Sequence, residues 1–71
     1  MKTFKSVTIN GKKLKIGDRV NDDKWDKINK QKPSFMRCEL ENTRGWICSR
    51  PEGHEGKHVA HGFSICEIWT E

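Results

Sequence analysis

The cysteines and histidines of this chain, three of each, are the residues whose types and spacing point to chemistry. One thiol and all three imidazoles lie between Cys48 and Gly62, in a stretch rich in glycine. A second thiol, Cys38, completes the spacing C-x9-C-x5-H-x3-H, in which His54 and His58 supply the imidazoles. Tetrahedral Zn²⁺ prefers such a set of two thiolates and two imidazoles. We therefore expect Cys38, Cys48, His54 and His58 to bind one structural zinc ion.

Two further residues, Cys66 and His61, also carry donor atoms that zinc can bind. Cys66 lies between Ile65 and Ile68 and is most simply a small buried hydrophobic residue. We expect His61 to hydrogen-bond a thiolate or a carbonyl near the metal, because metal sites are commonly supported in this way. Either residue would replace one of the four ligands if the set differs from the one above.

The size of the chain explains why a metal would be needed. It has 71 residues, of which 32% are hydrophobic and 8% aromatic, too few to bury a large core. Structural zinc contributes roughly 10–16 kcal/mol of apparent binding energy in small domains. We expect one domain over residues 1–71, with a basic hairpin region at 1–37 and a zinc-binding region at 38–71.

The compartment follows from the cysteines and the first residues. The chain begins MKTFKSVTINGKK, which holds no apolar run long enough for a signal peptide or a membrane span. An odd number of cysteines in a reducing cytoplasm favours zinc over a disulfide. We expect a cytoplasmic protein that has no membrane partner.

Positive charge is concentrated in the first half of the chain. Residues 1–37 hold eleven Lys and Arg against four Asp, whereas residues 38–71 hold three basic against six acidic residues. Such a half can bind nucleic acid or an acidic protein surface, but lysines on exposed strands also protect against edge pairing. The residues predicted to contact a partner are Lys12, Lys13, Lys15, Arg19, Lys24, Trp25 and Lys27, with Lys30 and Lys32 added for nucleic acid.

Alternating apolar residues on both sides of Asn10-Gly11 predict a β-hairpin over residues 7–16. The break at residues 17–18 and the restart at Arg19-Val20 resemble small SH3-like barrels with a curled sheet. Asn21 can cap at most one short helical turn around Trp25, before residues 32–33 end it. A polar loop pinned by Trp25 is the equal alternative for this segment.

A second hairpin is expected to carry the thiols, with strands at 35–40 and 46–48. Pairing about Thr43 would place Cys38 opposite Cys48 and Leu40 opposite Trp46. Residues 59–69 read as one closing strand with Phe63, Ile65 and Trp69 on one face. Trp46 and Trp69 are expected in the core more than Trp25. The predicted fold is therefore a small all-β domain, mainly of antiparallel hairpins, held together by zinc.

His54-Glu55-Gly56-Lys57-His58 also matches the H-E-x-x-H motif of zinc proteases, in which the Glu is the general base. That mechanism requires both His on one helix face and an open position on the metal. Gly56 destabilises a helix, and two thiolates would close the metal, so a zinc hydrolase is the least favoured of the functions considered.

The string CSRPEGHEGKHVAHG, residues 48–62, resembles the motif C-x-R-P-x-G-H-x-G-x-H-x-A-H-G of small, mostly uncharacterised zinc-binding proteins of phages and their bacterial hosts. The motif is followed by a Trp, here Trp69, and preceded by one or two Cys, here Cys38 alone. Cys66 is an addition to the pattern. The resemblance implies zinc ligation and a phage-like origin in a bacterial cytoplasm, without a common activity.

We expect a non-enzymatic protein that binds and modulates a host protein, and no small-molecule substrate. No nucleophile and base pair, phosphate loop or paired carboxylates can be assembled from these residues. Nucleic-acid binding through the basic half is the alternative. Because the excess charge is mostly Lys, such binding would show little sequence preference.

Overall fold

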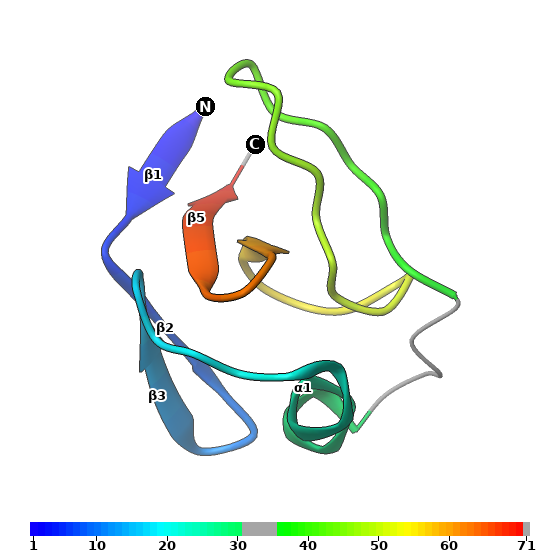
Figure 1. Cartoon of the computed structure of the whole chain (residues 1–71). Coiled ribbons are helices and arrows are strands. Elements are labelled where there is room, and N and C mark those ends of the chain that lie inside the picture. The colour runs from blue at the N-terminus through cyan, green and yellow to red at the C-terminus, as the bar shows by residue number, and fades with distance from the viewer. Residues whose placement is uncertain (31–35, 71) are drawn as a thin grey trace.

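The computed structural model describes residues 1–30 and 36–70, which form two antiparallel sheets and one helix. The first sheet has the strand order β1 (Lys2–Phe4), β5 (Ile65–Thr70), β4 (His58–His61), and the second pairs β2 (Ser6–Ile9) with β3 (Lys12–Lys15). Helix α1 spans Asp22–Asn29. The predicted small, mostly antiparallel β fold is confirmed, as two separate sheets in place of one curled sheet (Figure 1). The predictions that involve Lys32, Pro33 and Phe35 concern residues outside the described ranges.

The β2–β3 hairpin forms where the sequence predicts it. Asn10 and Gly11 both have positive φ, 49° and 80°, as a two-residue turn of this hand requires. Val7 lies opposite Leu14, and both side chains are buried. The hairpin then joins the first sheet, because Gly17 N–H donates to the carbonyl of Ile65 at 2.9 Å. Arg19 and Val20 form no strand, so the predicted restart of β-structure at 19–20 is wrong.

Residues 22–29 form a helix and not a polar loop, and with eight residues α1 is longer than the single turn expected. Asn21 caps it, since its side-chain oxygen accepts the Lys24 N–H at 2.9 Å. Trp25 is fully buried and anchors the second turn. The helix ends at Lys30, which takes the left-handed conformation with φ 49°. A helix this short depends on such tertiary packing for its stability.

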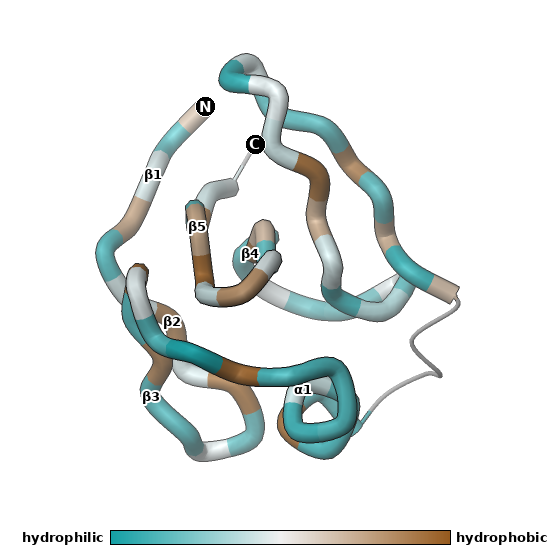
Figure 2. The backbone as a smooth tube through the Cα atoms, viewed as in Figure 1, coloured by the Kyte–Doolittle hydropathy of each residue, from teal (hydrophilic) through white to brown (hydrophobic). Residues whose placement is uncertain are grey.

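The segment predicted as one closing strand is a hairpin of two strands. Gly62, Phe63 and Ser64 form a turn in which Gly62 N–H donates to the Ser64 carbonyl at 3.0 Å. The prediction that Phe63 shares a strand face with Ile65 and Trp69 is therefore wrong, and its side chain is 97% exposed at the tip. Beyond the turn, β5 pairs with β4 on one side and with β1 on the other. It lies at the centre of the molecule and carries hydrophobic residues, as Figure 2 shows.

The segment 36–51 folds back on itself through two isolated bridges, Arg37 with Pro51 and Glu41 with Ile47. This register is shifted by two residues from the expected one, so Cys38 N–H donates to the carbonyl of Arg50 at 2.7 Å. The shift arises at the loop, where the Asn42 side chain accepts the N–H groups of residues 44 and 46. Cys38 and Cys48 are therefore not directly opposite each other.

Most of the large hydrophobic residues lie in a core shared by both sheets and α1. Its buried members are Val7, Ile9, Leu14, Val20, Trp25, Val59, Ile65 and Ile68. A second, smaller cluster of Cys48, Ala60 and Trp69 lies beside the loop 36–51. Trp46 is 43% exposed, so its predicted place in the core is wrong. Within the described ranges, no helix has the length and apolar character needed to span a membrane.

Candidate metal centre

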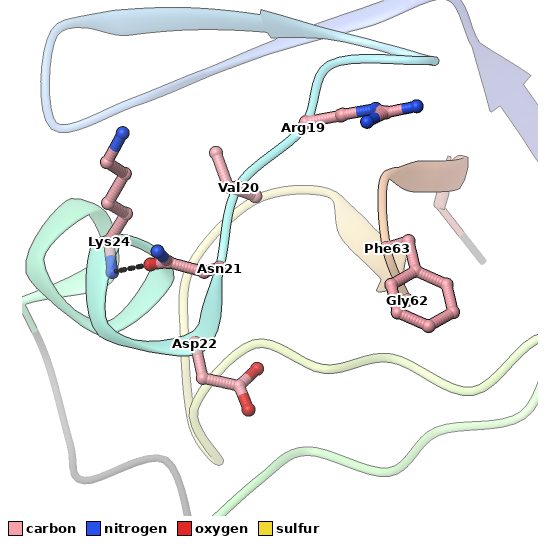
Figure 3. Close-up of a pocket in the computed structure, with 7 residues that line it drawn as sticks. All are labelled: Arg19, Val20, Asn21, Asp22, Lys24, Gly62 and Phe63. Carbon is pink, nitrogen blue, oxygen red and sulfur yellow. Dashed lines mark hydrogen bonds between the residues drawn. The ribbon is translucent and has the colours of Figure 1, made fainter.

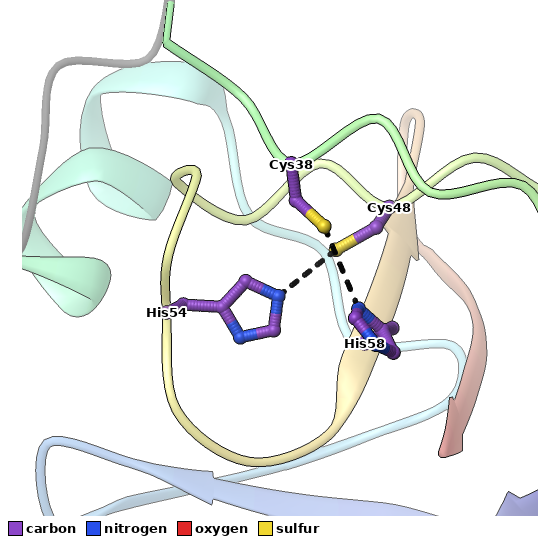
Figure 4. A group of neighbouring side chains, drawn as sticks. All are labelled: Cys38, Cys48, His54 and His58. Carbon is purple, nitrogen blue, oxygen red and sulfur yellow. Dashed lines mark hydrogen bonds between the residues drawn. The ribbon is translucent and has the colours of Figure 1, made fainter. Parts of the chain in front are cut away.

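The structure brings together the four residues predicted as zinc ligands. Cys38 and Cys48 come from the two arms of segment 36–51, His54 from the following loop, and His58 from the first position of β4. One side-chain atom from each lies within 4.8 Å of the others, an arrangement that could hold a metal ion. Figure 4 shows both sulfurs and both imidazole rings pointing toward one common centre.

The distances between donor atoms suit a tetrahedral ion. Zn–S bonds of about 2.3 Å and Zn–N bonds of about 2.0–2.1 Å place sulfur and nitrogen roughly 3.5 Å apart across a tetrahedron. Cys38 Sγ lies 3.6 Å from His58 Nδ1, and Cys48 Sγ lies 3.4 Å from His54 Nε2. Both sulfur–nitrogen separations therefore match the edges of a Cys₂His₂ zinc site.

The loop that carries His54 is wrapped around the side chain of Arg50. The Arg50 guanidinium donates through Nη1 to the carbonyls of Glu55, at 2.8 Å, and Lys57, at 2.7 Å. Its Nε donates to Asn29 Oδ1 of α1 at 3.4 Å. These bonds fix the loop on both sides of Gly56, whose φ of 81° favours glycine. Arg50 is only 4% exposed, so a buried cation sets the path between the two histidines.

Sequence reasoning did not assign a role to Arg50 or to Asn29. The position of Arg50 could have indicated its role. It lies two residues after Cys48 and immediately before Pro51, in the most crowded part of the motif. Asn29 carried none, because only the packing of α1 brings its side chain to the loop.

Burial sets the protonation of the donors in the metal-free site. Desolvation raises the pKa of the Cys48 thiol to about 11, and the neighbouring Cys38 adds to the shift. Desolvation also lowers the pKa of His54, with the Arg50 cation acting in the same direction, and this favours the neutral imidazole. A metal ion entering the site must therefore displace the Cys48 proton, whereas a neutral His54 has no net proton to lose.

Hydrophobic residues cover one side of the four donors. Cys48 is 1% exposed and packs in the cluster with Ala60 and Trp69. The ring of His58 lies against Trp69, with the ring centres 5.6 Å apart. A shell of this kind limits the access of water to a metal.

The H-E-x-x-H string does not form a helix. Residues 54–57 are loop, and His58 begins β4. The rings of His54 and His58 meet edge to face, 5.0 Å apart, and Glu55 is exposed. The arrangement of a zinc protease, with both imidazoles on one helix face, is absent from this described segment.

The two reserve donors lie outside the group of four. His61 stacks on Trp25, with ring centres 5.2 Å apart, and its Nε2 donates to the Val20 carbonyl. The expectation that His61 makes a hydrogen bond near the metal is therefore wrong. Its ring contacts Trp25 and Val20 of the larger core and not the four donors. Cys66 Sγ lies 3.3 Å from the carbonyl of Ser64 and packs against the smaller cluster.

Trp25 was predicted to contact a partner, and this is wrong. Its side chain has 0% exposure, and its Nε1 donates to the Ser49 carbonyl at 3.0 Å. The other residues of that prediction are all exposed to solvent: Lys12, Lys13, Lys15, Arg19, Lys24 and Lys27. Lys30 is exposed as well, and Lys32 lies outside the described residues.

Comparisons with protein-family models, with curated proteins and with solved structures find no significant match to this chain.

Proposed function

We propose that this is a non-enzymatic binding protein whose fold is stabilised by one structural zinc ion held by Cys38, Cys48, His54 and His58. The observation that carries the proposal is the convergence of the four donor atoms at separations suited to a tetrahedral ion. Four protein ligands leave no position for a catalytic water. The metal would then act on folding, and the function would reside on the surface.

Elemental analysis of the purified protein tests the metal, with one zinc per chain as the expected result. Chelation should unfold the chain in circular dichroism, since metal binding and folding are coupled in small domains. Cys48→Ser should lower the zinc content, while Cys66→Ser is the matched control and should leave it unchanged. A metal-free, fully folded protein would contradict the proposal.

Glu55→Gln tests the absence of catalysis. Glu55 would be the general base of a zinc hydrolase, but it is exposed on a loop beside two thiol donors. We expect the same lack of hydrolysis of peptide and ester substrates before and after the substitution. Turnover that is lost in the Glu55→Gln variant without loss of folding would favour the enzyme.

The proposed partner is a protein of the bacterial host, with the protein itself phage-encoded and located in the host cytoplasm. The phage-like motif at residues 48–62 supports this setting. An exposed apolar pair, Trp46 and Ile47, is 43% and 52% exposed. Trp is enriched among the residues that dominate interface energies.

The loop that carries this pair is held in place. Glu67 on β5 accepts hydrogen bonds from Asn42, at 2.5 Å, and from Arg44, at 2.9 Å. Glu67 itself is buried, so the loop 42–47 is fixed to the central strand. A preformed apolar pair loses less entropy on binding than a mobile one.

A pull-down from nuclease-treated bacterial lysate tests the partner. The wild-type chain and its Trp46→Ala variant are compared, with Lys2→Ala as a surface control. We expect a host protein that is retained by the wild type and the control and lost in the Trp46→Ala variant. Equal retention by all three would contradict the use of this loop.

Nucleic-acid binding is the second candidate function. The specific observation that favours it is the placement of most exposed basic residues of the first half around one hollow surface between β3 and α1.

A further inference from the structure

Three neighbouring hollows form one groove that runs from the β4–β5 turn past β3 and α1. The first, of about 580 Å³, lies between residues 19–24 and the turn residue Phe63 (Figure 3). The second and third, of about 240 and 210 Å³, follow along the hairpin and the helix. Consecutive hollows share lining residues, which are Arg19, Val20 and Lys24, then Lys12 and Ile28. We call this continuous surface the basic groove.

The basic groove carries the net charge of the protein. Its lining holds six cationic side chains, which are Lys12, Lys13, Arg19, Lys24, Lys27 and Lys30. It holds two acidic ones, Asp18 and Asp22, so its net charge is +4. The whole chain has 14 Lys and Arg and 10 Asp and Glu, which leaves eight of each sign elsewhere. The excess of +4 therefore lies entirely along this groove.

The two acidic residues are already engaged within the protein. Asp18 Oδ2 accepts the Lys15 N–H at 2.9 Å. Asp22 Oδ1 lies 3.9 Å from Arg37 Nη2. Asp18 thus bonds to a backbone amide, and Asp22 lies near a cation from outside the groove. With six cations against two carboxylates, the potential of the groove is positive.

The floor of the groove is apolar and its walls are tied together. Leu14 and Val20 are 2% and 8% exposed and belong to the main core. The side-chain amide of Asn10, in the hairpin turn, donates to the carbonyl of Ile28 in α1. The hairpin and the helix are thus linked directly, and the groove exists before any ligand binds.

Phe63 stands at one end of the groove, and its side chain is 97% exposed. In Figure 3, Gly62 and Phe63 of the β4–β5 turn lie across the hollow from Asn21 and Asp22. Folding gains nothing from a phenyl ring in this position, since its apolar surface stays in water. An aromatic ring beside a row of cations is the arrangement that stacks a base while phosphates follow the charges.

We propose that the basic groove binds single-stranded nucleic acid, with Phe63 stacking on a base and the cations contacting successive phosphates. This inference deepens the second candidate function and does not depend on the host-protein proposal. A duplex would offer phosphates, but its bases stack on each other and leave no face for Phe63. An acidic peptide would pair with the cations, but it offers no regular row of aromatic faces on which Phe63 could stack. Because the cations are mostly Lys, we expect binding to depend on the phosphate charges and to show little preference for base sequence.

Fluorescence anisotropy of a labelled oligothymidylate, with the zinc-loaded protein, tests the proposal. We expect binding at low salt that weakens steeply between about 50 and 200 mM salt, with a slope near −0.7 per phosphate neutralised. Phe63→Ala should weaken binding by about tenfold, since stacking on one base is lost. Phe63→Trp should retain it, and Met36→Ala, at an exposed apolar residue outside the groove, is the matched control.

Charge reversal provides a second, independent variant. Lys24→Glu places an acid in the first turn of α1, where helices tolerate it, and should weaken binding with a reduced salt slope. Lys2→Ala, on β1 outside the groove, is the control and should bind as the wild type does.

A labelled duplex and a poly-glutamate competitor separate the remaining outcomes. Duplex binding that equals single-strand binding and is unaffected by Phe63→Ala would overturn the single-strand inference but leave nucleic-acid binding standing. Failure of both nucleic acids to bind at low salt would overturn the two together. Binding of poly-glutamate in preference to oligothymidylate would replace the nucleic acid by an acidic protein segment.

Discussion

Arg50→Met should weaken zinc binding although Arg50 is not a ligand. The Arg50 guanidinium makes two short hydrogen bonds to the carbonyls of Glu55 and Lys57, which lie between the two histidine ligands. A hydrogen bond to a charged group contributes roughly 1.5–3 kcal/mol. Water can reach the carbonyls of this surface loop, so the lower value applies to each, or about 3 kcal/mol together. Met fills a similar volume but donates no hydrogen bond.

The zinc dissociation constant should therefore rise about 100-fold, because 1.4 kcal/mol corresponds to a factor of ten. Zinc binding must then supply the free energy that orders the loop. Competition against a chromophoric chelator at neutral pH measures the constant, and circular dichroism of the zinc-saturated variant verifies its fold.

Two further variants separate geometry from charge. Arg50→Lys keeps the cation near the thiols, but its ammonium ends one bond short of Arg50 Nη1, so an intermediate affinity is expected. Arg37→Met is the matched control, since Arg37 donates to the Ser49 carbonyl at 3.2 Å and makes no bond to the loop. Unchanged affinity in both Arg50 variants would refute the reasoning, and full recovery in Arg50→Lys would assign the effect to charge alone.

Three other predictions follow from burial and protonation. Zinc affinity should rise about tenfold per pH unit between pH 7 and 9 through Cys48 alone, because its pKa of about 11 keeps it protonated in the metal-free site. Chelator competition at several pH values measures this, and a flat profile would contradict it. Trp25→Ala should lower the free energy of unfolding of the zinc-loaded protein by about 3–5 kcal/mol, because the side chain is fully buried. Trp46→Ala should cost less than about 1 kcal/mol, and equal losses in urea titrations would count against the burial described. Glu67→Gln should loosen the loop 42–47 by removing the charge that binds Arg44. Faster hydrogen exchange in that loop is the expected readout, and unaltered exchange would show that the carboxylate does not anchor it.

Local signals in the sequence were sufficient to predict the structure where they determine the backbone conformation directly. Asn10-Gly11 specifies the hairpin, because both residues adopt positive φ in a turn of this type. The spacing of the thiols and imidazoles pointed to one cluster, because their donor types suit one ion whatever path the chain takes between them.

Long-range packing decided what the sequence did not reveal. The arms of segment 36–51 pair two residues away from the expected register, because Asn42 closes its loop with its own side chain. Trp25 and Trp46 occupy the reverse of their expected environments, since burial depends on where α1 packs. Arg50 is recognisable as a support of the loop only when the carbonyls around it are known.

The pairing of β1 with β5 has a consequence for synthesis on the ribosome. Lys2 lies opposite Thr70, and β1 precedes β5 in the chain, so β1 must wait for β5 before the central sheet can form. The four metal ligands, from Cys38 to His58, all leave the ribosome before β5 does. A nascent chain can thus capture zinc while β1 still exposes an unpaired edge. Because β5 is the strand that pairs with β1, zinc capture alone leaves that edge open to pairing with another chain until β5 has been made.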